Sequence, residues 1–368
     1  MSPARTYPER RDDVRLLVVD PVSRAVRATR TPEIPNLLAA GDVLVVNDAA
    51  TVPASLAGRD EAGHPFEVRL IARDHDRDGD HFWAVLLGEG DWHAKTEDRP
   101  TPALVAPGTR LAFGALSGEV VAVSPLSAAL VSLRFLAEPD AMWAALYREG
   151  RPVQYSYLAH DLPLWAVQTV YAARPWAFEM PSAGRPFSWE ILLALRQRGV
   201  RLASVTHAAG LSSTGHASID AALPLPEAFE IPATTVAAIR EAHQSGCRVI
   251  AVGTTVVRAL EGAAARSGAL EAGSGITDLR IGSGHPLRVV DGLFTGIHVA
   301  GESHFELLRA FASADLLGQA LAYAEAHGFT THELGDAMLV LPSVATDKAT
   351  TYSLRGGEVP RPPYAACG

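Results

Sequence analysis

The stretch CRVIAVGTTVVRALEGAAARSG, residues 247–268, joins a strand-like run directly to a helix-like run. Its first part, CRVIAVG, is short, apolar and rich in β-branched residues, which predicts a buried strand. The second part begins at Thr254 and ends at Gly268, and it predicts a helix. A strand that passes straight into a helix is typical of an α/β domain.

The same alternation extends upstream of this stretch. SWEILLALRQRG begins with the helix-start residue Ser188 and ends with the stop residue Gly199, and the strand-like run VRLASV follows it. PATTVAAIREAHQSG predicts another helix, with Pro232 in its first turn and Gly246 at its end. These segments predict an α/β domain built on a mixed sheet.

Both ends of the chain add to this pattern. VRLLVVD (14–20) and VLVVN (43–47) predict buried strands. LRVVDGLFTGIHV (287–299) has two β-like runs around Asp291-Gly292, which is the strongest short-range signal for a β-hairpin. The final segment, residues 343–368, has little apolar periodicity, so we expect it to wrap around the body or fray.

Residues 66–136 follow a different pattern. The short strand-like runs FEVRLIA, FWAVLLG, TRLAFG and LVSLRFL are separated by polar or proline-rich breaks, among them DHDRDGD and SGE. Regular strand spacing without a helical period predicts a small all-β barrel. We therefore predict a mixed α/β fold, with a discontinuous α/β domain of residues 1–56 and 138–368 and an inserted β-barrel domain of residues 57–137.

Composition limits the class of protein. The chain has 368 residues, 48% hydrophobic and 20% charged, which predicts a folded protein of about two domains. The net charge of −9 argues against a surface that binds a polyanion all over, although a local basic face remains compatible with nucleic acid. A protein with a negative net charge suits a cationic cosubstrate better than it suits a polyanion.

The terminal residues and cysteines indicate a compartment. The amino-terminal MSPARTYPERRDD precedes no apolar stretch long enough for a signal peptide, and no run of eighteen apolar residues occurs. Cys247 and Cys367 cannot form a disulfide framework or a four-thiolate metal site. We therefore expect a cytoplasmic protein with no membrane partner.

Common catalytic motifs are missing from the sequence. It contains no GxxxxGK[ST], HExxH, GxSxG or Cys/His zinc spacing, and its glycines do not form GxGxxG. HELGD at His332 lacks the second histidine of a zinc motif. These absences leave little support for a metal site or a dinucleotide-binding fold, and we expect no metal.

The strand-to-helix junction at Gly253 is the most informative candidate site. Free N–H groups at a helix start bind a carboxylate or phosphate, and Arg258 lies one turn beyond Thr254 and Thr255. The alternative is an ordinary helix cap by Thr254 with a surface arginine. Taken alone, these residues slightly favour the cap.

Other polar residues have functional and structural interpretations of similar weight. Asn47 and Asp48 follow a buried strand and suit either a ribose or a loop backbone. Asp291 is first of all a turn residue, and Asp336 suits backbone donors in a loop. His298 is able to act as a general acid or base, although a single histidine among thirteen is more often structural.

The order of these segments carries a specific resemblance. RRDDVRLLVVD, LLAAGDVLVVNDAATVPASLAG and WAVQTVYAARPWAFEMPSAGRPFSWEILLAL are followed by RVIAVGTTVVRALEG, ITDLRIGSGHPLRVVDGLFTGIHVAGES and LGDAMLVL. Together these blocks resemble the S-adenosylmethionine:tRNA ribosyltransferase-isomerase family of queuosine biosynthesis. The resemblance covers residues 10–341.

The resemblance implies an α/β catalytic domain with a barrel-like sheet and an inserted β-barrel. It also implies that the ribosyl part of S-adenosylmethionine is transferred to a 7-aminomethyl-7-deazaguanine base in tRNA and rearranged, with release of adenine and methionine. S-adenosylmethionine is then a cosubstrate, and no cofactor or metal is needed. The sulfonium acidifies the C5′ proton for removal by a base, and adenine departure needs a proton donor.

Residues at matching positions are expected to form the site. The catalytic candidates implied in this way are Asp291, His298 and Asp336. The residues implied to bind substrate or cosubstrate are Asn47, Asp48, Ser182, Gly253, Thr254, Thr255, Arg258 and Asp278.

Several family positions differ in this chain. Ala50 and Ser55 replace arginines, Pro186 and Gly296 replace a histidine and an asparagine, and a histidine is displaced to His207. These changes predict weaker tRNA binding unless other arginines form a replacement face. The candidates for such a face are Arg5, Arg10, Arg11, Arg15, Arg148 and Arg151.

These departures leave two alternatives to the family reaction. One is a repurposed enzyme that uses S-adenosylmethionine with a small-molecule acceptor. The other is a protein that binds S-adenosylmethionine without catalysis. Release of adenine separates the enzymes from the binding protein.

Overall fold

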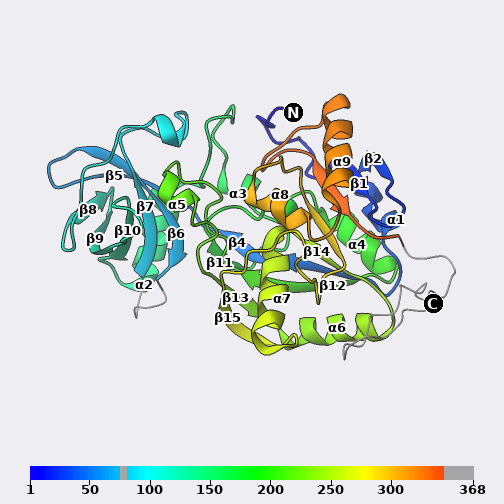
Figure 1. Ribbon diagram of the computed structural model, residues 1–368. Coiled ribbons are helices and arrows are strands. Elements are labelled where there is room, and N and C mark those ends of the chain that lie inside the picture. Colours follow the sequence, from blue (N-terminus) through cyan, green and yellow to red (C-terminus); the bar gives the residue numbers. More distant parts are fainter. Residues whose placement is uncertain (75–80, 344–368) are drawn as a thin grey trace.

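A computed structural model describes residues 1–74 and 81–343 of the chain. Figure 1 shows a small β-barrel beside a larger body in which helices cover a sheet. Most of the DHDRDGD break and all of the carboxyl-terminal segment beyond Ser343 lie outside the described residues. Within the described ranges, no helix is both long and apolar enough to cross a membrane.

The body is built on a mixed sheet of nine strands. Its strands, in spatial order, are β15 (Gly273–Thr277), β13 (Glu227–Ile231), β12 (Arg201–His207), β3 (Val43–Asn47), β14 (Val249–Val252), β16 (Gly292–Gly296), β17 (Ala337–Val340), β1 (Arg15–Val19) and β2 (Val26–Arg30). The central strands β12, β3, β14 and β16 are parallel, and β13, β15, β17 and β2 introduce antiparallel pairs. The predicted mixed α/β fold is therefore confirmed.

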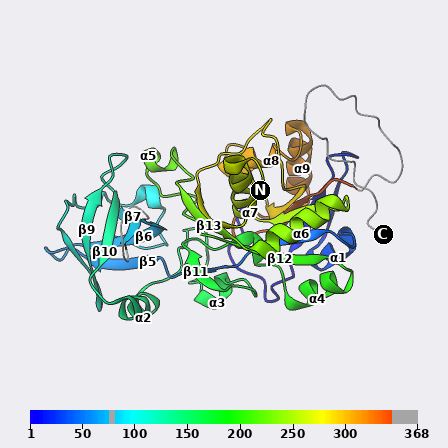
Figure 2. The same cartoon turned by 90° about the horizontal axis from the view of Figure 1, so that it is seen from below.

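Helices cover both faces of this sheet. On one face, α6 (Ala233–Gln244), α7 (Thr254–Ser267) and α9 (Ala314–Ala326) share a core with Val43 and Val45. On the other face, α1 (Ile34–Leu37) and α4 (Trp189–Gln197) share a core with Leu44 and Val46 (Figure 2). Because alternate residues of β3 enter different cores, residues 43–46 of the strand are all apolar, as the sequence indicated.

Local signals set the ends of these helices as predicted. The Ser188 hydroxyl accepts a hydrogen bond from the Ile191 N–H at 3.4 Å and caps α4. The α7 helix begins after Gly253 and ends before Gly268, and both glycines have positive φ angles, of 92° and 81°. A side chain at either position would be strained, so glycine marks both ends.

The predicted hairpin around Asp291-Gly292 is wrong. The N–H groups of Arg288, Val289 and Val290 donate to the buried carboxylate of Glu261, each at 2.9 Å, and form no strand. Strand β16 begins at Gly292 and pairs with β14 and β17 instead. A buried acceptor far away in the sequence thus replaces the local strand pairing that the turn signal favoured.

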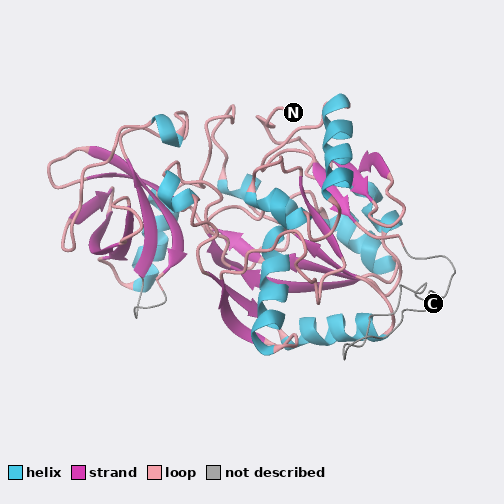
Figure 3. Ribbon diagram, viewed as in Figure 1, coloured by secondary structure: helices cyan, strands magenta, loops and turns pink. Residues whose placement is uncertain are grey.

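The inserted β-barrel is confirmed. It is a closed barrel of six strands, and Figure 3 shows this unit as strands and loops with almost no helix. The six barrel strands, in spatial order, are β10 (Leu130–Phe135), β7 (His81–Leu87), β6 (Pro65–Arg73), β5 (Ser55–Arg59), β8 (Arg110–Phe113) and β9 (Leu116–Val123). The SGE segment is not the predicted break, because Ser117, Gly118 and Glu119 lie within β9; the turn falls at Gly114, where φ is 62°.

Short elements connect the barrel to the body. β4 (Ala49–Thr51) pairs with β11 (Arg174–Ala177), and α2 (Pro139–Glu149) follows the last barrel strand. The remaining short helices are α3 (Leu164–Val167), α5 (Ala217–Asp220) and α8 (Ser303–Leu308), with 3-10 turns η1 (Thr31–Glu33), η2 (Thr96–Asp98) and η3 (Ser182–Gly184). Segments around these connections line a large cavity between the barrel and the body.

Candidate active site

A cavity of about 920 Å³ lies between the body and the barrel. The segments that follow β12 and β14, and the end of β16, form its body side, and the barrel loop at residues 94–97 lines another side. Ligands of open α/β sheets bind outside the carboxyl ends of the strands, which is where this cavity lies. Its volume is sufficient for a cosubstrate of the size of a nucleoside.

The amino-terminal end of α7 faces this cavity. Gly253, Thr254 and Thr255 line it together with Ser182, which begins the short turn η3. The first N–H groups of a helix have no partner within the helix and carry a partial positive charge. Backbone donors and hydroxyl groups therefore meet here in a site suited to a carboxylate.

Arg258 lines the same cavity but already has a partner. Its Nη2 donates to the carboxylate of Glu227, whose other oxygen accepts the Gly210 N–H at 3.0 Å. His207 Nε2 lies 3.4 Å from Glu227 without hydrogen-bond geometry, and burial lowers the pKa of His207 to about 4. Arg258 thus compensates the buried charge of Glu227. A bound anion would therefore be contacted mainly by the N–H groups at the amino-terminal end of α7.

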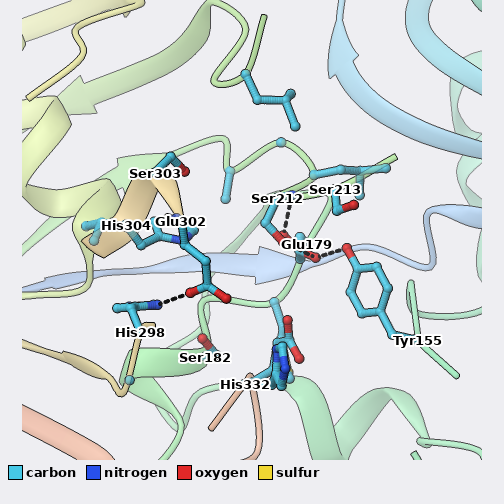
Figure 4. A pocket seen from close by; sticks show the side chains of 18 of the residues that line it. Tyr155, Glu179, Ser182, Ser212, Ser213, His298, Glu302, Ser303, His304 and His332 are labelled. Carbon is cyan, nitrogen blue, oxygen red and sulfur yellow. Dashed lines mark hydrogen bonds and ion pairs between the residues drawn. The ribbon is translucent and has the colours of Figure 1, made fainter. Parts of the chain in front are cut away.

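A histidine cluster forms another part of the cavity wall, as Figure 4 shows. His298 Nε2 lies 2.9 Å from the Thr295 hydroxyl, and its Nδ1 lies 3.8 Å from Glu302 Oε2. The His304 ring is 4.8 Å from the His298 ring, and burial, with the neighbouring His298, holds the pKa of His304 well below its ordinary value. His298 is therefore held between a hydroxyl and a carboxylate.

Burial opposes the ionisation of Glu302, but hydrogen bonds from His298 and the Val299 N–H hold its pKa below the ordinary value. Glu302 is thus suited to remain ionised beside His298. A carboxylate that faces Nδ1 orients the His298 ring, and a proton taken up at Nε2 must pass through or displace the Thr295 hydroxyl.

Across the cavity, a buried carboxyl group is enclosed by hydrogen-bond donors (Figure 4). Glu179 accepts from the Tyr155 hydroxyl and from Ser212, whose N–H and hydroxyl lie at 2.8 and 3.2 Å. Burial raises the pKa of Glu179 and raises that of Tyr155 well above its ordinary value. Both groups thus favour the uncharged state more than they do in water.

The loop between α9 and β17 brings two more titratable residues to the cavity. His332 has a left-handed backbone, with φ of 67°, and its ring stacks on Tyr157 at 4.7 Å. Burial raises the pKa of the neighbouring Glu333 to about 7. HELGD lacks the second histidine of a zinc motif, and its last three residues open the family block LGDAMLVL. No local signal indicated that His332 and Glu333 face a cavity.

Five residues predicted for the site do not line this cavity: Asp336, described below, and the four that follow here. Asn47 joins β3 to β12 through hydrogen bonds with the backbone of His207, and Asp48 accepts hydrogen bonds from Ser204 and Thr206. Asp278 is exposed after β15. Asp291 is buried at the opposite end of β16, where its carboxylate accepts the Val249 N–H at 2.9 Å. Asn47, Asp48 and Asp291 thus make structural contacts, and the roles predicted for these four residues stay predictions.

Asp336 lies behind the cavity and lines a small hollow of about 10 Å³ together with Ser182 and His332. Its carboxylate accepts hydrogen bonds from the N–H and side chain of Arg15 and from the N–H and hydroxyl of Thr330. Because its lone pairs are occupied, Asp336 holds the loop that carries His332. These contacts give Asp336 a positioning role, and its predicted catalytic role stays a prediction.

We expect Asp336→Ala to lower the free energy of unfolding by about 1.5–3 kcal/mol, the usual value of hydrogen bonds to a charged group. Turnover should fall with it, because the His332 loop loses its anchor. Urea denaturation measures the first effect and product formation the second. Lost turnover with unchanged unfolding would contradict this account and restore Asp336 as a catalytic group.

The family departures lie in different surroundings. Gly296 lines the large cavity and Pro186 lines the small hollow. Ser55 lies in the barrel and donates to Glu67 at 2.8 Å, and Ala50 lies in β4. His207 is fully buried beside Glu227. Two of these five positions therefore touch the cavities directly.

An α/β body with an inserted barrel, and between them a cavity carrying histidines and buried carboxyl groups, has the architecture of an enzyme. The model of the family described as "Queuosine biosynthesis protein" matches residues 2–340. Two relatives are each 34% identical to this chain. They are the S-adenosylmethionine:tRNA ribosyltransferase-isomerases of Synechococcus elongatus, over 351 residues, and Thermus thermophilus, over 343 residues. The matches cover 92% and 90% of this chain and 92% and 94% of the relatives.

A solved structure agrees with this assignment. The crystal structure of S-adenosylmethionine tRNA ribosyltransferase from Thermotoga maritima is similar with a TM-score of 0.51 and 26% identity, covering 92% of this chain and 96% of that one. The chain belongs to the S-adenosylmethionine:tRNA ribosyltransferase-isomerase family, as its sequence blocks indicated. Members of this family are transferase-isomerases that move the ribosyl part of S-adenosylmethionine onto a modified tRNA base.

Proposed function

We propose that this protein transfers the ribosyl part of S-adenosylmethionine to the 7-aminomethyl-7-deazaguanine base of a tRNA and isomerises it, releasing adenine and methionine. Family membership over nearly the whole chain carries this proposal. A tRNA acceptor places the reaction in the cytoplasm.

The charge of the cavity supports a cationic cosubstrate. Seven Asp or Glu side chains line it, against three from Lys or Arg. S-adenosylmethionine carries a sulfonium and an ammonium group, both of which are attracted by carboxylates. Its carboxylate suits the donors at Thr254 and Thr255, where the α7 terminus opens into the same cavity.

We assign the removal of the C5′ proton to His298. Its ring lies between the Thr295 hydroxyl and Glu302, and no other histidine of the cavity has both kinds of neighbour within the described residues. A carboxylate beside the imidazole stabilises the imidazolium that forms when the ring accepts a proton. Ser182, Gly253, Thr254 and Thr255 complete the proposed binding site.

The proposed tRNA contact is weakened by the surroundings of the arginines. Arg10 pairs with Asp12, Arg15 with Asp336, and Arg148 and Arg151 pair with Glu149 and Asp161. Of the six candidates for a replacement face, only Arg5 and Arg11 lack a carboxylate partner in the described structure. Paired arginines contribute less positive potential to a phosphate backbone.

We expect tRNA bearing the aminomethyl base to stimulate adenine release with a shallow salt dependence. Each phosphate contact contributes about 0.7–0.9 to the slope of log affinity against log salt, so two missing arginine contacts remove about 1.5. Titration of tRNA at low and moderate salt, with adenine release as the signal, measures this slope. A steep slope with saturable turnover would contradict weakened tRNA binding.

A small-molecule amine is the second candidate acceptor. The excess of carboxylates in the cavity favours an amine and does not itself require a polyanion. Incubating the protein with S-adenosylmethionine and a small primary amine, with no RNA present, tests this alternative. Adenine release without RNA would favour it over tRNA.

A further inference from the structure

Glu333 lines the cavity and has one buried carboxyl oxygen without a hydrogen-bond partner among the described residues. This oxygen is Oε2. A buried polar atom without a partner is costly, and such atoms in native structures often await a ligand. Glu179, the other buried carboxyl group nearby, already accepts hydrogen bonds on both oxygens.

The backbone holds Glu333 in place. Asp336 accepts from Thr330 on the far side of the loop, and the Gly335 N–H donates to the His332 carbonyl at 2.9 Å. The left-handed backbone of His332 turns the chain immediately before Glu333. Non-glycine residues in this conformation often occur at functional sites, where the surrounding structure maintains the strain.

Aromatic rings lie beside this carboxyl group. Tyr155 and Tyr157 stack with ring centres 6.0 Å apart, and His332 stacks on Tyr157 while remaining exposed. Figure 4 shows His332 at the cavity between the Glu302 wall and the Tyr155 wall. Exposed aromatic faces of this kind stack on nucleic-acid bases. An aromatic surface next to a carboxylate suits a planar base with a cationic arm.

The charged groups around Glu333 leave room for such a cation. The Tyr155 hydroxyl donates a hydrogen bond to Glu179, and the Glu302 carboxylate faces the His298 ring. Arg69 reaches the Tyr155 ring at 5.7 Å but forms its ion pair with Glu67. Since no described cation forms an ion pair with Glu333, a ligand cation would be its partner.

We propose that Glu333 binds the primary ammonium group of the acceptor base and accepts its proton. This inference rests on the proposed function and assigns a catalytic residue to its acceptor step. The N–H bond breaks and its proton passes to Glu333 Oε2. The lone pair left on nitrogen forms the bond to the ribosyl carbon. Over the whole reaction two bonds of the cosubstrate break: the electron pair of the carbon–sulfur bond leaves with methionine, and the electron pair of the glycosidic bond leaves with adenine, which takes up a proton.

The test compares wild type, Glu333→Gln, Glu333→Asp and the matched control Glu61→Gln, which alters an exposed barrel carboxylate outside the cavity lining. The acceptor is an RNA stem–loop bearing 7-aminomethyl-7-deazaguanine, and adenine release is measured across pH. Glu333→Gln should lower kcat/KM for this RNA by about 10²–10³-fold, as expected for a lost general base. Its pH profile should lose the limb near pH 7, Glu333→Asp should recover part of the rate, and Glu61→Gln should match wild type.

Calorimetry supplies a readout that does not depend on turnover. The free base 7-aminomethyl-7-deazaguanine should bind Glu333→Gln about 10- to 100-fold more weakly than wild type, whereas the 7-methyl analogue should bind both equally. The affinity for S-adenosylmethionine alone should not change.

Equal binding of the aminomethyl base by both proteins overturns the inference. Weakened S-adenosylmethionine binding also overturns it, because Glu333 would then face the cosubstrate. Failure of the proposed function gives a different result, namely wild type that releases no adenine with the RNA, and the base-binding comparison still decides the role of Glu333.

Discussion

Replacing Arg258 with alanine is expected to lower the free energy of unfolding by about 3–5 kcal/mol, because it leaves a buried carboxylate without its counter-charge. That carboxylate belongs to Glu227, and the exposed fractions of the Arg258 and Glu227 side chains are 9% and 7%. Two histidines lie near this pair, but burial lowers the pKa of His207 to about 4, and burial together with His298 holds the pKa of His304 well below its ordinary value, so both remain neutral near pH 7. No nearby group therefore takes over the lost charge.

Urea denaturation measures this effect, and Arg240→Ala is the matched control. Arg240 is exposed on α6 and its side chain forms no hydrogen bond or ion pair among the described residues, so its removal should change stability little. Arg258→Ala combined with Glu227→Gln should recover much of the lost stability. If Arg258→Ala instead weakens S-adenosylmethionine binding and leaves unfolding unchanged, Arg258 contacts the ligand, as its position in the sequence suggested.

Replacing His298 with alanine is expected to lower the rate of adenine release by about 10²–10⁴-fold, the usual contribution of a general base. Unfolding should change little, because the His298 ring contacts mainly Thr295, Glu302 and His304 at the cavity wall. Single-turnover measurements with saturating S-adenosylmethionine isolate the chemical step.

His64→Gln serves as the control for this experiment. His64 is an exposed barrel histidine that pairs with Asp60, far from the cavity lining. The His64→Gln variant should retain wild-type turnover. Near-normal adenine release by His298→Ala would exclude His298 as the base, whereas loss of both turnover and stability would make its role structural.

Much of the body was predictable because its signals are local. Strand β3 was predicted with its observed bounds, and the Ser188 cap and the glycines that flank α7 define helix ends through their own backbone preferences. The barrel was predictable from strand spacing. The absence of a hairpin at Asp291 was not predictable, because the N–H groups of residues 288–290 donate to Glu261, which lies in helix α7.

The site was predictable in part. Ser182, Gly253, Thr254, Thr255, Arg258 and His298 were named from the sequence and line one cavity. The roles of Arg258 and Asp336 depended on Glu227 and Arg15, which are distant in the sequence. Glu179, Glu302 and Glu333 had no local signature, since isolated glutamates are common on protein surfaces.

The sequence by itself determined the family, the α/β body with its inserted barrel, and the helix start at the edge of the site. Each of these depends on residue order or on interactions within a few neighbouring residues. Only the tertiary structure decided which polar side chains face the cavity and which satisfy one another. Burial changes their pKa values and their need for partners, and burial is a property of the packed chain that no single segment contains.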